Sequence, residues 1–196
     1  NEGEIYINNQ PVKLRSPIDA TKHGIRVIYQ ELETLEDLTV MENIFLGEYP
    51  NNRLKVISWK KIEEDAREVL KKLNSSIDPR KVMSDLQTVD KQIVVIARAI
   101  WRESKLIVMD EPTAALSEDD TNNLFNVISV LKRHGISIIY ISHRLNEVFK
   151  ITDRITILRD GKKIETVDTK DTSEHDLITK MIGMKLKNYY PKESCK

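Results

Sequence analysis

The sequence has little of what would mark several common classes of protein. A single cysteine, Cys195, excludes an internal disulfide and a zinc site built from cysteines. The apolar runs have the length of strands, whereas a membrane-spanning helix needs about 18 or more apolar residues. Lys plus Arg total 31 and Asp plus Glu total 31, so net charge gives no reason to expect a nucleic-acid partner.

Glycine is scarce as well, and the phosphate-binding loop pattern G-x-x-x-x-G-K-[ST] is absent. Of the six glycines, only Gly161 is followed by lysine, and it lacks both the upstream glycine and a following Ser or Thr. The pair Asp160-Gly161 is instead typical of a hairpin turn between strands at 155–159 and 162–167. The sequence therefore offers no phosphate-binding loop of its own.

The clearest pattern that is present lies between residues 105 and 143. An apolar run at 106–109 is soon followed by Pro112, which stops a strand because proline cannot donate to a β-ladder. Ser117 is a good N-cap for the helix that follows, and a second apolar run occupies 136–141. Strand, helix and strand with short connections predict a right-handed βαβ unit with parallel strands.

Reactive side chains follow both strands of this unit. Asp110 and Glu111 end the first strand, and His143 comes just after the second. Because parallel strands end at one edge of a sheet, where open α/β sheets bind ligands, we expect the three side chains to lie together. Two carboxylates and an imidazole suit a metal ion with a general base. The alternative is that the acids only solvate a strand end and His143 is a surface residue.

Three motifs in this stretch resemble those of the ATP-binding cassette (ABC) ATPases. Residues 106–113 are similar to the Walker B motif, and 140–143 to the switch-histidine loop. The residues that resemble the family's D-loop are Ala114, Ala115, Leu116 and Ser117. The resemblance covers nearly the whole chain, in particular to the N-terminal cassette of the tandem-cassette ATPases of bacterial ribose- and galactose-type importers. It implies an α/β fold of the P-loop NTPase type, a parallel sheet flanked by helices with an inserted helical subdomain.

The resemblance also implies a division of the chain. The parts are the start of the ATPase core with a hairpin and the Q-loop strand (1–31), the helical subdomain (32–97), the rest of the core (98–183) and a linker tail (184–196). The family's phosphate loop lies upstream of the segment that matches residues 2–5, so we expect a fragment of a longer ATPase. Without that loop's amides and lysine, we expect this chain by itself neither to bind ATP tightly nor to hydrolyse it.

Roles for single residues follow from the same resemblance. Asp110 would hold Mg²⁺, helped by Gln30 at the Q-loop position, and Gln30 would also position the attacking water. Glu111 would polarise that water as the general base. His143 would contact the γ-phosphate of ATP and stabilise developing charge. Considered alone, Gln30 fits an ordinary polar residue at a strand end better than a functional one.

The family's signature motif, Leu-Ser-Gly-Gly-Gln, is degenerate in this chain. Its place is taken by Leu86, Gln87, Thr88, Val89 and Asp90. Glycine lets a backbone approach phosphate closely, and Val89 would put a branched side chain in the way. At about 5 Å and an effective dielectric near 20, Asp90 would repel a phosphate by on the order of 3 kcal/mol per unit charge. We expect this half-site to be weak or silent.

The function implied is that of the ATP-binding and ATP-hydrolysing subunit of a monosaccharide importer, with ATP and Mg²⁺ as cofactors. The implied partners are a second cassette, membrane permease subunits and a periplasmic or extracellular sugar-binding protein, with no nucleic acid. The implied location is cytoplasmic and peripheral, on the inner face of the bacterial cell membrane. One alternative is an inert cassette-fold partner or regulatory module, which the missing loop favours and the intact Asp110, Glu111 and His143 oppose. Another is a non-transport ABC protein acting on ribosomes or DNA, which the neutral charge disfavours.

Overall fold

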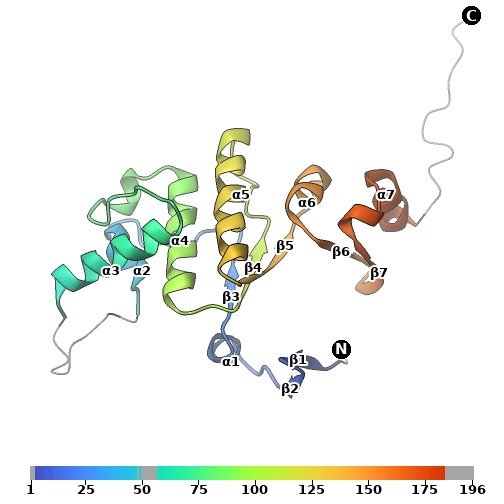
Figure 1. Cartoon of the computed structure of the whole chain (residues 1–196), viewed down its shortest axis with the longest axis horizontal. Helices are drawn as coiled ribbons and strands as arrows, with labels where there is room; N and C mark the ends of the chain where they lie inside the picture. The colour runs from blue at the N-terminus through green and yellow to red at the C-terminus, as the bar shows by residue number, and fades with distance from the viewer. Residues whose placement is uncertain (1–2, 48, 50–56, 184–196) are drawn as a thin grey trace, which may run out of the picture. The chain divides into compact units, whose positions relative to one another are not determined.

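A computed structural model describes residues 3–47, 49 and 57–183 (Figure 1). By their internal contacts, residues 1–141 and 142–196 form two compact units. The predicted linker tail, 184–196, lies outside the described residues. Among the helices that the structure describes, none combines the length and the apolarity needed to cross a membrane.

A parallel sheet of three strands lies at the centre of the first unit. Its order is β3 (Ile25–Ile28), β4 (Leu106–Asp110) and β5 (Ser137–Ile141), with both pairs parallel. Helix α5 (Glu118–Arg133) connects β4 to β5, starting at its N-cap Ser117 as the sequence predicts. The expected βαβ unit is therefore confirmed.

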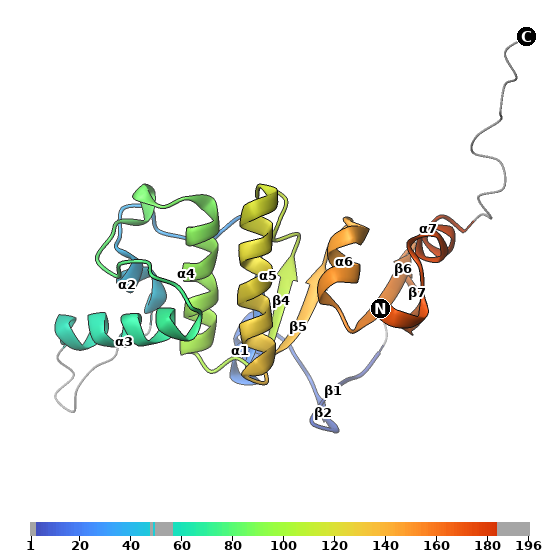
Figure 2. The same cartoon turned by 45° about the horizontal axis from the view of Figure 1, so that its top comes forward.

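Two helices, α4 (Thr88–Trp101) and α5, lie side by side and pack on this sheet (Figures 1 and 2). The strand residues that alternate toward the helices, Ile28, Ile107 and Met109, are at most 3% exposed. The residues of the other face are more open, and Val27 and Ile139 are 43% and 48% exposed. In the described structure, helices cover one face of this largely apolar parallel sheet, whereas residues on the opposite face are exposed.

The helices between β3 and α4 begin at side-chain caps. Thr39 and Glu42 form a reciprocal capping box at the start of α2 (Val40–Ile44). Ser58 caps α3 (Trp59–Lys72), which buries its apolar stripe, namely Ile62, Ala66, Val69 and Leu70.

The predicted helical subdomain, 32–97, has no strand within its described part, where a β-bridge joins Thr39 to Val82. A 3₁₀ turn at Met83–Asp85 precedes α4. The predicted boundary between residues 97 and 98 falls inside α4, which runs without a break to Trp101. The division into subdomains stays a prediction.

The N-terminal segment forms a hairpin and a short helix. Strands β1 (Ile5–Ile7) and β2 (Gln10–Val12) pair antiparallel. Asn8 and Asn9 connect them with φ values of 51° and 61°, which two-residue hairpin turns of type I′ require. The hairpin expected within residues 1–31 is confirmed, and α1 (Pro17–Lys22) leads on to β3.

The second unit is a small α/β arrangement with its own core. Its elements are α6 (Leu145–Ile151), β6 (Arg154–Arg159), β7 (Lys162–Asp168), a 3₁₀ turn (Thr169–Asp171) and α7 (Glu174–Ile182). The turn between β6 and β7 is made by Asp160-Gly161, as predicted. Its core contains Val148, Ile155, Ile157 and Leu177. Helix α6 was not predicted, because it is short and follows Arg144, which makes no side-chain cap.

Candidate functional site

The two adjacent carboxylates lie where β4 leaves the sheet. Asp110 is the last residue of β4, pairs with Ile141 of β5 and is half-buried. Glu111 is also half-buried and has a φ of 44°, in the left-handed region that few non-glycine residues adopt. Its backbone N–H donates to the carbonyl of Ile141 at 2.9 Å. The chain therefore turns sharply at Glu111 while still bound to β5.

The segment predicted as a D-loop forms the connection from this turn to α5. Pro112 and Thr113 follow Glu111 and are buried. Ala114 and Ala115 are exposed. The predicted segment also contains Leu116, which is half-buried, and Ser117, which is exposed. The Ser117 hydroxyl accepts the backbone N–H of the third helical residue at 3.2 Å, so that side chain is engaged in capping α5.

Gln30 follows the neighbouring strand. β3 ends at Ile28, which pairs with Met109 immediately before Asp110, so Gln30 and Asp110 come from adjacent strand ends at the carboxyl edge of the sheet. The Gln30 side chain is exposed. The sheet brings these two residues to one edge, as the sequence predicts; a shared metal ion stays a prediction.

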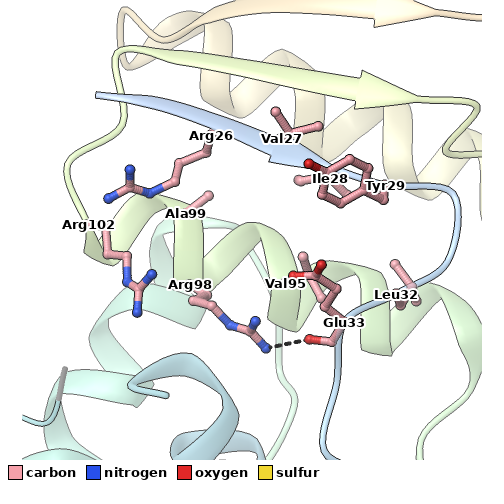
Figure 3. Close-up of a pocket in the computed structure, with 10 residues that line it drawn as sticks. All are labelled: Arg26, Val27, Ile28, Tyr29, Leu32, Glu33, Val95, Arg98, Ala99 and Arg102. Atoms are coloured by element: carbon pink, nitrogen blue, oxygen red, sulfur yellow. Dashed lines mark hydrogen bonds between the residues drawn. The ribbon is translucent and has the colours of Figure 1, made fainter. Parts of the chain in front are cut away.

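A pocket beside the end of β3 carries three arginines of the first unit, Arg26, Arg98 and Arg102 (Figure 3). Arg98 of α4 donates from Nη2 to the carbonyl of Glu33 at 3.0 Å, and from Nε to the carbonyl of Asn43 at 2.9 Å. Burial, and then the neighbouring charge of Arg102, lower the pKa of the Arg98 guanidinium. These bonds fasten the segment that follows Gln30 to α4.

His143 lies in the second unit, two residues beyond β5, and is exposed. The turn that carries it is held by the Ser142 hydroxyl, which accepts the backbone N–H of Arg144 at 3.0 Å and donates to Glu147 at 3.3 Å. Glu147 is 4% exposed and also pairs with Arg144 at 3.2 Å. Sequence analysis missed Glu147. The available signal was its position three residues after Arg144, a spacing that allows an ion pair on a helix.

The degenerate signature spans the entry into α4. Leu86 is buried, Gln87 is the exposed N-cap residue, and Thr88 is the exposed first residue of the helix. Val89 is only 4% exposed, so its side chain packs inside the unit. This corrects the expectation that Val89 would obstruct an approaching phosphate, because a helix turns each successive side chain by about 100° and the second residue here faces inward.

Asp90 is half-buried in the first turn of α4. It lines a polar pocket together with Lys81 and Asn123. Burial raises the pKa of the Asp90 carboxyl, Lys81 lowers it in part, and Asp120 raises it further. Gln87 and Thr88 are the exposed side chains at the N-terminus of α4.

A buried contact that sequence analysis also missed joins α4 to the carboxylate turn. Gln92 is 3% exposed, and its Nε2 donates to the carbonyl of Pro112 at 2.7 Å. A single amide side chain in a helix that is otherwise mostly apolar on its buried side makes Gln92 unusual in the sequence, but it does not identify Pro112 as the partner.

The donors at the carboxyl edge fit a metal that arrives with a phosphate ligand. Within the described ranges, no group of three or more His, Cys, Asp or Glu side chains is placed to hold a metal ion. Mg²⁺ is usually held by one or two carboxylates, with substrate phosphates and water completing its octahedron. Asp110, at the sheet edge, suits that kind of site.

Comparison with known proteins gives a consistent result. A family model described as "ABC transporter" matches residues 1–114. The chain is 42% identical over 192 residues to the ribose import ATP-binding protein RbsA of Lactococcus lactis subsp. cremoris (strain SK11), covering 98% of this chain and 39% of that protein. It is 41% identical over 194 residues to the galactose/methyl galactoside import ATP-binding protein MglA of Clostridium tetani (strain Massachusetts / E88), covering 97% and 38%. The chain thus spans about two fifths of the length of these curated relatives.

Solved structures share the fold. A crystal structure of an ATP-binding cassette of an ABC transporter in its ADP conformation matches with a TM-score of 0.77 and 26% identity, covering 93% of this chain and 78% of that one. A nucleotide-free cassette matches with a TM-score of 0.74 and 25% identity, covering 93% and 74%. The α/β cassette fold expected from the sequence is confirmed.

Proposed function

The chain belongs to the ABC transporter family, and from this we propose that it is part of the ATP-hydrolysing subunit of a bacterial monosaccharide importer. The observation that carries the proposal is the Asp110-Glu111 pair at the carboxyl end of β4, in a chain about 40% identical to ribose and galactose import ATP-binding proteins. Because the relatives are much longer, the activity belongs to a parent protein that includes this segment.

In the proposed reaction Asp110 would hold Mg²⁺, and the bound ion would neutralise charge on the phosphates of ATP. Glu111 accepts a proton from the attacking water as the general base. Its fixed turn supports this role, since a base has to lie within hydrogen-bond reach of the water. Gln30, on the adjacent strand end, orients the same water.

His143 donates to the γ-phosphate in this proposal and stabilises the charge that develops on it. The exposure of His143 supports this role. At the start of α4, Gln87 and Thr88 offer two side-chain donors and the helix N-terminus to a second nucleotide. Thr88 still supports a weak half-site there, because its exposed side chain occupies a position where the family's glycine lets a phosphate approach the backbone.

Further chain has to complete this site, because the phosphate loop is absent from the sequence. The open face of the sheet supports that view. Parallel sheets are almost always covered on both faces, whereas Val27, Ile139 and Ile141 are each more than 40% exposed. We take this face, together with the loop, to be completed in the parent protein.

The proposed partners are a second cassette, permease subunits in the membrane and a sugar-binding protein outside it. The parent would lie on the cytoplasmic face of the membrane, bound to the permease. These assignments rest on the family and on the names of the relatives, and the sugar could be ribose, galactose or another monosaccharide.

The test uses the full-length parent protein and its Glu111→Gln variant. Mg²⁺-dependent ATP hydrolysis should fall by at least about a hundredfold in the variant, with ATP binding kept, because a general base contributes about 10²–10⁴-fold. Glu118→Gln is the matched control, an exposed carboxylate in the first turn of α5. Cells lacking the parent should lose uptake of labelled ribose or galactose. An unmodified parent that binds but never hydrolyses ATP would instead favour the inert-partner alternative.

A further inference from the structure

Gln92 lies in the second turn of α4, within its buried face. Its amide is almost fully buried and donates from Nε2 to the Pro112 carbonyl at 2.7 Å, twenty residues further along the chain. Buried polar side chains are nearly always hydrogen-bonded, but the partner here belongs to the turn that carries Glu111. We infer that Gln92 is a positioning residue for Glu111, acting through the Pro112 carbonyl. This rests on the proposed function, in which Glu111 is the general base.

The turn is held by two other elements. On one side, the Glu111 N–H donates to the carbonyl of Ile141 in β5 at 2.9 Å. On the other, the Pro112 carbonyl accepts from Gln92 of α4. Glu111 itself has a φ of 44°, a conformation that persists only where surrounding contacts maintain it. Since proline has a fixed φ, a shift of the Pro112 carbonyl passes along a stiff segment to Glu111.

The same bond connects the start of α4 to this turn. Gln92 is four residues after Thr88, the first residue of α4, so the two lie one above the other on the same face. The hydrogen bond from Gln92 therefore joins the helix that begins beside Gln87 and Thr88 to the carboxylate turn.

The test compares Gln92→Met with the unmodified full-length protein. Methionine keeps the length and apolar packing of the side chain but removes the donor. The kcat for ATP hydrolysis should fall about tenfold to a hundredfold, the loss typical of a base misplaced by about 1 Å. The KM for ATP should change by less than about threefold, because Gln92 acts on the reaction step and not on substrate binding.

Ser104→Ala is the matched control. Ser104 is 6% exposed, and its hydroxyl donates to the carbonyl of Ala99 at 2.7 Å, a buried bond of the same length at the far end of α4. This variant should lose stability without losing kcat, once rates are corrected for the folded fraction. An equal loss of kcat in both variants would overturn the inference, because general loosening of α4 would then explain it.

Gln92→Glu adds a readout that a purely structural residue would not change. A protonated carboxyl can donate to the Pro112 carbonyl, whereas a carboxylate cannot. The ratio of variant to unmodified kcat should therefore rise several-fold from pH 8 to pH 6, with circular dichroism used to check that the protein is folded at both. A flat ratio overturns the inference, as does a folded Gln92→Met variant with kcat within about twofold of normal. If Gln92→Met does not fold, the pH profile decides. If the unmodified parent protein does not hydrolyse ATP, the proposed function itself is wrong, and this result is distinct from a failure of the inference about Gln92.

Discussion

Replacing Asn43 with alanine should destabilise the first unit by about 2–4 kcal/mol. Asn43 lies in α2 with no exposed surface. Its Oδ1 accepts the backbone N–H of Leu35 at 2.9 Å, and its Nδ2 donates to the carbonyls of Leu35 and Thr39 at 3.0 and 3.1 Å. One side chain thus fixes the segment that runs from Gln30 to the helical region.

The magnitude follows from these three bonds. Each contributes about 1 kcal/mol net, which gives about 3 kcal/mol for the set. The small cavity left by alanine adds to the loss. Hydration of the freed Leu35 backbone reduces it, because the Leu35 side chain is already 46% exposed and water has a short path to the peptide.

Urea denaturation, followed by far-UV circular dichroism and by tryptophan fluorescence, measures the change. Trp101 contacts Phe45, the residue after α2, edge to face at 4.7 Å between ring centroids, so its emission reports on this region. Asn126→Ala, at an exposed site on α5, is the control and should stay within about 0.5 kcal/mol of the unmodified chain. A loss at Asn43 no larger than the control's would refute the account of how this segment is held.

Three further predictions concern single positions. Burial raises the folded-state pKa of Asp90 above its unfolded value, so Asp90→Asn should be more stable than the unmodified chain at pH 7. The stability difference between the two chains should shrink as the pH falls through the folded-state pKa, and it should vanish below the unfolded-state pKa. Urea midpoints at several pH values measure this difference. Thr39→Ala removes half of the capping box with Glu42 and should cost about 1 kcal/mol in the same assay, while an unchanged midpoint would argue against the cap. Gly183→Ala should destabilise the second unit, seen as a lower melting temperature, because Gly183 ends α7 with a φ of +79°, which a residue with a Cβ adopts only with strain; an unaltered melting temperature would contradict this.

Local signals predicted most of the secondary structure. Ser58 and Ser117 start helices because a side-chain oxygen can accept an orphan backbone N–H, and this depends only on residues three positions away. The Asn8-Asn9 turn likewise follows from a local tolerance for positive φ. Helix α6 was missed because it begins without such a cap, and packing against the core of the second unit stabilises it instead.

The candidate site was also predictable from the sequence only in part. The carboxylates Asp110 and Glu111 could be recognised in the sequence, because they directly follow an apolar strand and precede a strand-ending proline. Their roles, and those of Gln30 and His143, stay predictions. The inward direction of Val89 and the buried bond from Gln92 could not be read from the sequence, since a helix that is apolar on most sides does not reveal which face meets which neighbour.

By itself, then, the sequence determined the order and type of most elements, the parallel βαβ unit and the family, because each rests on local periodicity, capping or motif spacing. Only the tertiary structure decided that α4 holds both the segment after Gln30, through Arg98, and the turn beside Glu111, through Gln92. These contacts join residues 20 to 65 positions apart, and they exist because strands and helices distant in sequence pack on one face of the same sheet.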